Sequence, residues 1–147
     1  MIREIHRVLK PGGLVIVSTP NVLNLRSRLH YLTCGFPNLF GPLAVGERDV
    51  HNTRGHINPV GLFYLVHALL EANFVDVRVN VDRYQRRSLL AFFLLYLPIH
   101  IAWRYNYRRE LKKYRTITPQ NYWVVRAINS RQVLLGRTLI VTARKSR

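Results

Sequence analysis

The sequence predicts an α/β fold in which three strands are flanked by helices. Short runs rich in β-branched residues occur at 14–18, 74–81 and 138–143, as expected for strands. Segments with apolar residues at helical spacing lie between these runs, which is typical of the α/β class. With 147 residues, the chain has room for one domain with a modest core.

The first predicted elements are a helix over 1–9 and a strand that follows a Pro-Gly-Gly turn at 11–13. Proline cannot continue a helix, and the two glycines suit a tight turn. The continuous apolar run at 14–17 is typical of a strand covered on both faces in a parallel sheet. Asn21 follows its carboxyl end, where open α/β sheets place their ligands. We therefore expect Asn21 to bind substrate.

A short basic amphipathic helix is expected over 22–32, directly after this ligand end. Arg26 and Arg28 lie between its apolar residues, and either guanidinium could meet a phosphate on a substrate. We assign Arg26 to substrate binding, with a solvated helix arginine as the alternative. Six glycines and prolines follow within 33–57, which predicts a long loop of the kind that often acts as a lid.

The clearest helix is expected to begin at Pro59, with Asn58 as its N-cap, and to end at Asn73. The strand at 74–81 alternates valine with polar residues, so one of its faces should be drier. A later helix is expected to start at Thr118 and to precede the last strand at 138–143.

An apolar run at 88–103 carries arginine clusters on both sides. As a helix it would be about 24 Å long, short of the roughly 30 Å hydrocarbon core of a bilayer, and Pro98 interrupts it. We expect it to lie in the headgroup region of a membrane or to dip in and back, with a buried helix followed by a solvated basic helix as the alternative. The segment 83–131 is therefore predicted to be an insertion in a domain formed by 1–82 and 132–147.

The positive charge belongs to the second half of the chain. Residues 1–82 hold 8 Lys and Arg against 6 Asp and Glu, whereas residues 83–147 hold 15 against Glu110 alone. Such asymmetry favours an anionic partner, either phospholipid or nucleic acid. We favour an anionic membrane surface, because hydrocarbon burial explains the adjoining Leu and Phe residues and nucleic-acid binding does not.

The stretch from Arg7 to Asn21, with Lys-Pro-Gly-Gly before the strand and Thr-Pro-Asn after it, resembles the segment around the fifth strand of class I S-adenosylmethionine-dependent methyltransferases. His56-Ile57-Asn58-Pro59 and Glu71-Ala72-Asn73-Phe74 resemble the region before that family's sixth strand. The resemblance covers roughly the second half of a family domain. It implies a partial Rossmann-like sheet in which the last strand runs antiparallel between the other two.

The resemblance also implies S-adenosylmethionine as the cofactor of the parent enzyme. Family members bind it through a glycine-rich loop after the first strand, and no Gly-x-Gly occurs in the 147 residues. We therefore expect this chain to be the carboxyl-terminal part of such an enzyme and to lack cofactor-binding residues of its own.

Methyl transfer to a hydroxyl needs an oriented acceptor and a group that removes its proton. We assign His56 as the catalytic base and His51 to substrate binding, with solvent-exposed loop histidines as the alternative. No spacing of His, Asp or Glu in this loop matches a metal motif, and the single cysteine, Cys34, excludes an intrachain disulfide.

The leading interpretation is a methyltransferase fragment whose parent enzyme acts on a small-molecule or lipid-linked acceptor. We expect a cytoplasmic location, peripheral at the inner face of the membrane. A non-catalytic membrane-binding or interaction module is the first alternative, and a nucleic-acid methyltransferase is the second.

Overall fold

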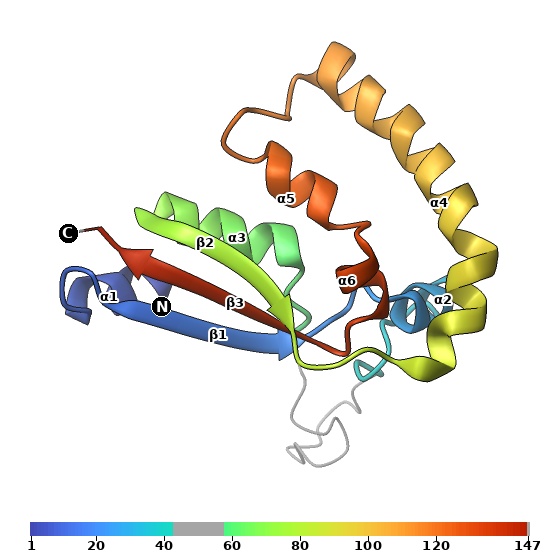
Figure 1. The fold of residues 1–147 in the computed structure, drawn as a ribbon, viewed down its shortest axis with the longest axis horizontal. Coiled ribbons are helices and arrows are strands. Elements are labelled where there is room, and N and C mark those ends of the chain that lie inside the picture. Colours follow the sequence, from blue (N-terminus) through green and yellow to red (C-terminus); the bar gives the residue numbers. More distant parts are fainter. Residues whose placement is uncertain (43–57, 147) are drawn as a thin grey trace.

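The computed structural model describes residues 1–42 and 58–146. Its three strands form one sheet with the order β1-β3-β2, and β3 pairs antiparallel with both neighbours (Figure 1). The strands are β1 (Leu14–Pro20), β2 (Phe74–Val81) and β3 (Thr138–Lys145). The predicted α/β class, the three strands and the antiparallel position of the last one between the other two are confirmed.

The described residues also form six α-helices, one 3₁₀-helix and one π-helix. They are α1 (Ile2–Val8), α2 (Leu25–Cys34), α3 (Leu62–Glu71), the 3₁₀-helix η1 (Arg86–Ser88), α4 (Leu89–Arg109), the π-helix η2 (Glu110–Tyr114), α5 (Tyr122–Ala127) and α6 (Arg131–Leu135).

The Pro-Gly-Gly turn joins α1 to β1 as predicted. Gly12 has a φ of 74°, and a Cβ on Gly13 would lie 2.7 Å from the nearest atoms, so both positions favour glycine. Lys145, at the end of β3, donates from Nζ to the backbone oxygens of His6 and Leu9 at 2.8 and 2.9 Å. The carbonyls at the end of α1 are thereby satisfied by a residue from the last strand.

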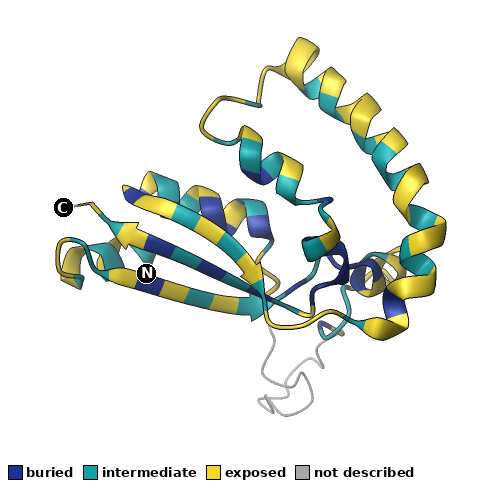
Figure 2. Ribbon diagram, in the orientation of Figure 1, coloured by how far each residue is buried: buried dark blue, intermediate teal, exposed yellow. Residues whose placement is uncertain are grey.

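The main core lies on one face of the sheet, where α1, α3 and α5 contribute side chains (Figures 1 and 2). Its most buried members include Leu62, Val66 and Leu69 of α3 with Leu139 and Val141 of β3. These residues recur at helical spacing in α3 and at every second position in β3, so each element buries one face in this core.

The prediction that the first strand is covered on both faces is wrong for the described residues. Val15 is buried, but Leu14 is 48 % exposed and Ile16 is 62 % exposed. Although residues 14–17 are all apolar, buried and exposed side chains alternate along β1. Among the described elements, β1 pairs only with β3, and none of them covers its outer face.

Two predicted helix starts are also corrected. α3 begins at Leu62 with Gly61 as N-cap, three residues after the expected proline, although Asn73 ends the helical segment as predicted with a φ of 62°. α5 begins at Tyr122 with Asn121 as its N-cap, and the side-chain oxygen of Asn121 accepts a hydrogen bond from the Thr118 backbone N–H at 2.9 Å. The residues that follow Thr118 therefore form a turn before the helix begins.

The apolar run forms a longer helix than predicted. α4 continues through Pro98 to Arg109, and the helical segment 86–114 has 29 residues, or about 43 Å. The predicted break at Pro98 is wrong. The helix loses one backbone hydrogen bond at this exposed residue, and the hydrogen-bonded helical turns before and after it are enough to keep the segment helical. By length and composition, this segment could cross a membrane.

The inner face of α4 packs against a second, smaller core. Ala91, Phe92, Leu95 and Ile99 contact the buried side chains of Leu25 from α2 and of Leu134 and Leu135 from α6. The sequence analysis had not predicted α6, which is five residues long and is capped by the Ser130 hydroxyl. The insertion proposed over 83–131 contributes Val124 of α5 to the main core.

Candidate functional site

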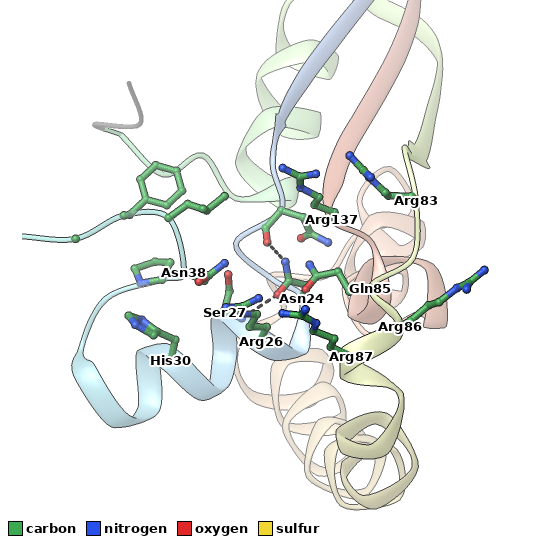
Figure 3. A pocket seen from close by; sticks show the side chains of 15 residues that line it. Asn24, Arg26, Ser27, His30, Asn38, Arg83, Gln85, Arg86, Arg87 and Arg137 are labelled. Atoms are coloured by element: carbon green, nitrogen blue, oxygen red, sulfur yellow. Dashed lines mark hydrogen bonds between the residues drawn. The ribbon is translucent and has the colours of Figure 1, made fainter. Parts of the chain in front are cut away.

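A cavity of about 940 Å³ lies beyond the carboxyl end of β1 (Figure 3). It is lined by the start of α2, by residues 37–41, by the connection from β2 into η1 and by the residue before β3. Five arginines line it, and none of its described lining residues is acidic; the arginines are Arg26, Arg83, Arg86, Arg87 and Arg137.

Asn21 is buried and is one of the residues that line this cavity. Its side-chain N–H groups donate to the backbone oxygens of Val133 at 2.7 Å and Gly136 at 2.9 Å, and its Oδ1 accepts from the Leu23 N–H. The amide therefore holds the end of β1 against α6. Both side-chain donors are used within the protein, so the role that the structure gives Asn21 is structural, and its contact with a substrate stays a prediction.

Asn24 sets the direction of α2 and was missed by the sequence analysis. This buried residue is the N-cap: its Oδ1 accepts from the Ser27 N–H at 2.8 Å, and its Nδ2 donates to the Asn21 backbone oxygen at 2.6 Å. Asparagine is a preferred N-cap, so the signal was present in the sequence. The cap fixes the first turn of α2, which carries Arg26 to the cavity.

The two arginines of α2 have different roles. Arg26 is exposed and lines the cavity, as substrate binding would require, although no described contact tests that assignment. Arg28 donates to the backbone oxygens of Leu23 and Ile128 and to Oδ1 of Asn129, at 2.7 to 3.0 Å. Burial lowers the pKa of the Arg28 guanidinium. Because Arg28 ties α2 to the end of α5, it is not available to a phosphate in the cavity.

The other cavity arginines come from distant parts of the chain. Arg83 forms an ion pair with Asp82 at 3.5 Å, while Arg26, Arg87 and Arg137 have no carboxylate within ion-pair distance among the residues in 1–42 and 58–146. In Figure 3, Arg137 and Arg83 lie above Asn24 and Arg26 and Arg87 lie below it, whereas Arg86 points away from the group. The local field of the cavity is therefore strongly positive.

His30 also lines the cavity, and its Nδ1 lies 2.7 Å from the Phe36 backbone oxygen. The two predicted loop histidines, His51 and His56, lie outside the described residues, so their assigned roles stay predictions. No cluster of three or more metal-ligating side chains occurs in the part of the chain that the structure describes.

A second feature, the apolar stripe, runs along the outer face of α4. It consists of Leu90, Phe93, Leu94, Leu97 and Ile101, each between 62 and 76 % exposed. Their spacing of three and four residues places them on one side of the helix, and Figure 2 shows α4 as mostly exposed. Continuing the same spacing leads to Arg86 and Arg87 at one end and to Arg104 and Arg108 at the other.

The molecule is thus a mixed α/β protein with an antiparallel three-stranded sheet, an arginine-lined cavity and an exposed apolar helix. Solved structures that are similar to it are S-adenosylmethionine-dependent methyltransferases. One is from Archaeoglobus fulgidus, with 14 % sequence identity and a TM-score of 0.46, and the match covers 98 % of this chain and 50 % of that one.

Two others are structures of phosphoethanolamine N-methyltransferase 2 from Haemonchus contortus. One contains phosphomonomethylethanolamine and S-adenosylhomocysteine, and the other contains S-adenosyl-L-methionine. Each is 15 % identical with a TM-score of 0.38, and the match covers 99 % of this chain and 29 % of that one. The chain therefore spans half or less of these proteins. No family model and no curated protein sequence matches it.

Proposed function

We propose that this chain is the carboxyl-terminal part of an S-adenosylmethionine-dependent methyltransferase domain that works at an anionic membrane surface. The main support for the methyltransferase part of this proposal is the strand order β1-β3-β2. The resemblance of residues 7–21 to the fifth-strand region of the class I enzymes implied that the last strand would run antiparallel between the other two. The observed order agrees with what that resemblance implies, and it therefore supports the proposal.

In this proposal the chain supplies the acceptor side of the active site. The cavity lies past the carboxyl end of β1, where open α/β sheets place their ligands, and His56 is the proposed base for a hydroxyl acceptor. Residues that approach S-adenosylmethionine come from a glycine-rich segment that these 147 residues do not contain.

The membrane half is supported by the apolar stripe. Five large apolar side chains on one helix face, with arginines at both ends, form the pattern of a helix that lies in the plane of the membrane interface. The opposite face of α4 packs against α2 and α6. A crossing orientation would carry those helices and the nearby arginines toward the hydrocarbon, at a high cost in free energy, so we favour the in-plane orientation.

Calorimetric titration with S-adenosylmethionine tests the methyltransferase half. Residues 1–147 alone are expected to show no micromolar binding, because they lack the glycine-rich loop. A chain extended by the reading frame upstream of Met1 is expected to bind, and that frame is expected to encode a strand followed by Gly-x-Gly. Micromolar binding by residues 1–147, or an upstream frame without such a segment, would favour a non-catalytic membrane-binding module instead.

A further inference from the structure

We propose that the arginine-lined cavity binds the phosphate group of a phosphorylated amphiphile whose hydrocarbon chain lies along the apolar stripe. This inference deepens the proposed function and rests on its membrane part. It names the ligand class from two features, a concave cationic site and an exposed apolar helix face, which Arg86 and Arg87 of the cavity lining connect along one helical segment.

The composition of the cavity points to an anion with several acceptor oxygens. Arg26, Arg87 and Arg137 have no carboxylate partner among the described residues, and together they offer many N–H donors in fixed planar geometry. Guanidinium groups bind phosphate through paired hydrogen bonds, and bringing three of them together without an anion is electrostatically unfavourable. A bound phosphate would remove that repulsion.

The site is held by structural contacts that do not use these arginines. The Asn24 cap and the three hydrogen bonds of Asn21 fix the turn after β1, while Arg28 fixes α2 to the end of α5. Among the described residues, no ion pair occupies Arg26, Arg87 or Arg137, while the backbone that carries them is already ordered. Such preorganisation lowers the entropy cost of binding.

The position of the cavity selects an amphiphile over a soluble phosphate. Arg87 lines the cavity from η1 and lies three residues before Leu90, the first member of the apolar stripe, so the cavity lining ends within one helical turn of the stripe. A phosphate held at Arg87 would have its attached chain directed onto Leu90, Phe93 and Leu94. Nucleic acid offers the same phosphate chemistry, but it has no hydrocarbon to cover this stripe.

The double variant Arg26→Gln/Arg87→Gln tests this site. Both residues are exposed, so the variant is expected to fold, which circular dichroism would verify. The matched control is Arg3→Gln/Lys10→Gln, which removes the same charge from exposed positions in and just after α1. Binding is measured by co-flotation with phosphatidylcholine vesicles that contain either phosphatidic acid or, at equal surface charge, oleate.

We expect the Arg26/Arg87 variant to lose about tenfold or more in affinity for phosphatidic acid vesicles, since charged hydrogen bonds to the phosphate are removed. On oleate vesicles it should behave like the control. Equal losses for both variants on both vesicles, or tighter binding of wild type to RNA than to phosphatidic acid vesicles, would overturn the inference.

Soluble sn-glycerol 3-phosphate separates the two sources of phosphate. As a competitor it should displace wild type from phosphatidic acid vesicles more weakly than short-chain phosphatidic acid does, because it lacks the chain. Equal potency would overturn the amphiphile assignment.

If wild type fails to float but binds glycerol 3-phosphate through Arg26 and Arg87, the membrane part of the proposed function fails. If it floats without a difference between the variants, the phosphate inference fails.

Discussion

The apolar stripe gives the sharpest test of membrane attachment. Phe93, Leu94 and Leu97 are 76, 67 and 65 % exposed and contribute to neither core cluster, so replacing all three with Ser should leave the fold intact. Full burial of such a side chain contributes about 1.5–3 kcal/mol, and roughly two thirds of each is available to a membrane. The three together therefore contribute about 3–6 kcal/mol, or at least about 100-fold in partitioning.

The assay is flotation with vesicles that contain anionic phospholipid, at low and at high salt. Wild type should stay bound at high salt because the apolar part of the attachment is not screened, whereas the triple variant should be released. Val8→Ser/Tyr64→Ser, which removes exposed apolar side chains from α1 and α3, is the matched control and should float like wild type. Salt-resistant flotation of the triple variant, or wild type in the soluble fraction, would refute the in-plane helix.

Two further predictions concern the residues that shape the cavity. Arg28→Ala should lower the free energy of unfolding by roughly 2–4 kcal/mol in urea titrations, because it leaves two backbone oxygens and the Asn129 side chain without their charged donor. As the control, Arg26→Ala should lower the free energy of unfolding by less than about 0.5 kcal/mol. Equal stability of the two variants would contradict the structural role of Arg28. Gly136→Ala should cost about 1–3 kcal/mol in the same urea titrations, since its Cβ would lie 2.7 Å from the Gln132 oxygen and overlap Val81. At Gly41 a Cβ would meet no described atom within 4 Å, so Gly41→Ala should be neutral.

The sequence predicted local elements well because their signals are local. The β-branched runs located all three strands, and Pro11 with the two following glycines located the turn before β1. The order of the strands came from the resemblance to the methyltransferase family. The coverage of β1 could not be predicted, because the exposure of Leu14 and Ile16 depends on which elements pack over the sheet.

The cavity was only partly predictable for a related reason. Arg26 was identified from its place after the first strand, and Arg86 and Arg87 were recognised only as flanks of the apolar run. Their meeting with Arg137, more than one hundred residues from Arg26, is a property of the tertiary fold. The structural role of Arg28 also could not be predicted from the neighbouring sequence, since its partners Ile128 and Asn129 lie about one hundred residues away in the chain.

The central place of β3 has a consequence for how the protein is made. Within the described residues, β1 and β2 do not pair with each other, and each has residues 138–145 as its strand partner. During synthesis, the helix α4 therefore leaves the ribosome before these three strands can pair, and pairings as distant as Leu14 with Arg144 close last. The nascent chain would expose its apolar stripe while the rest of the domain is still unfolded. Early contact of α4 with a membrane or a chaperone would protect this intermediate from aggregation.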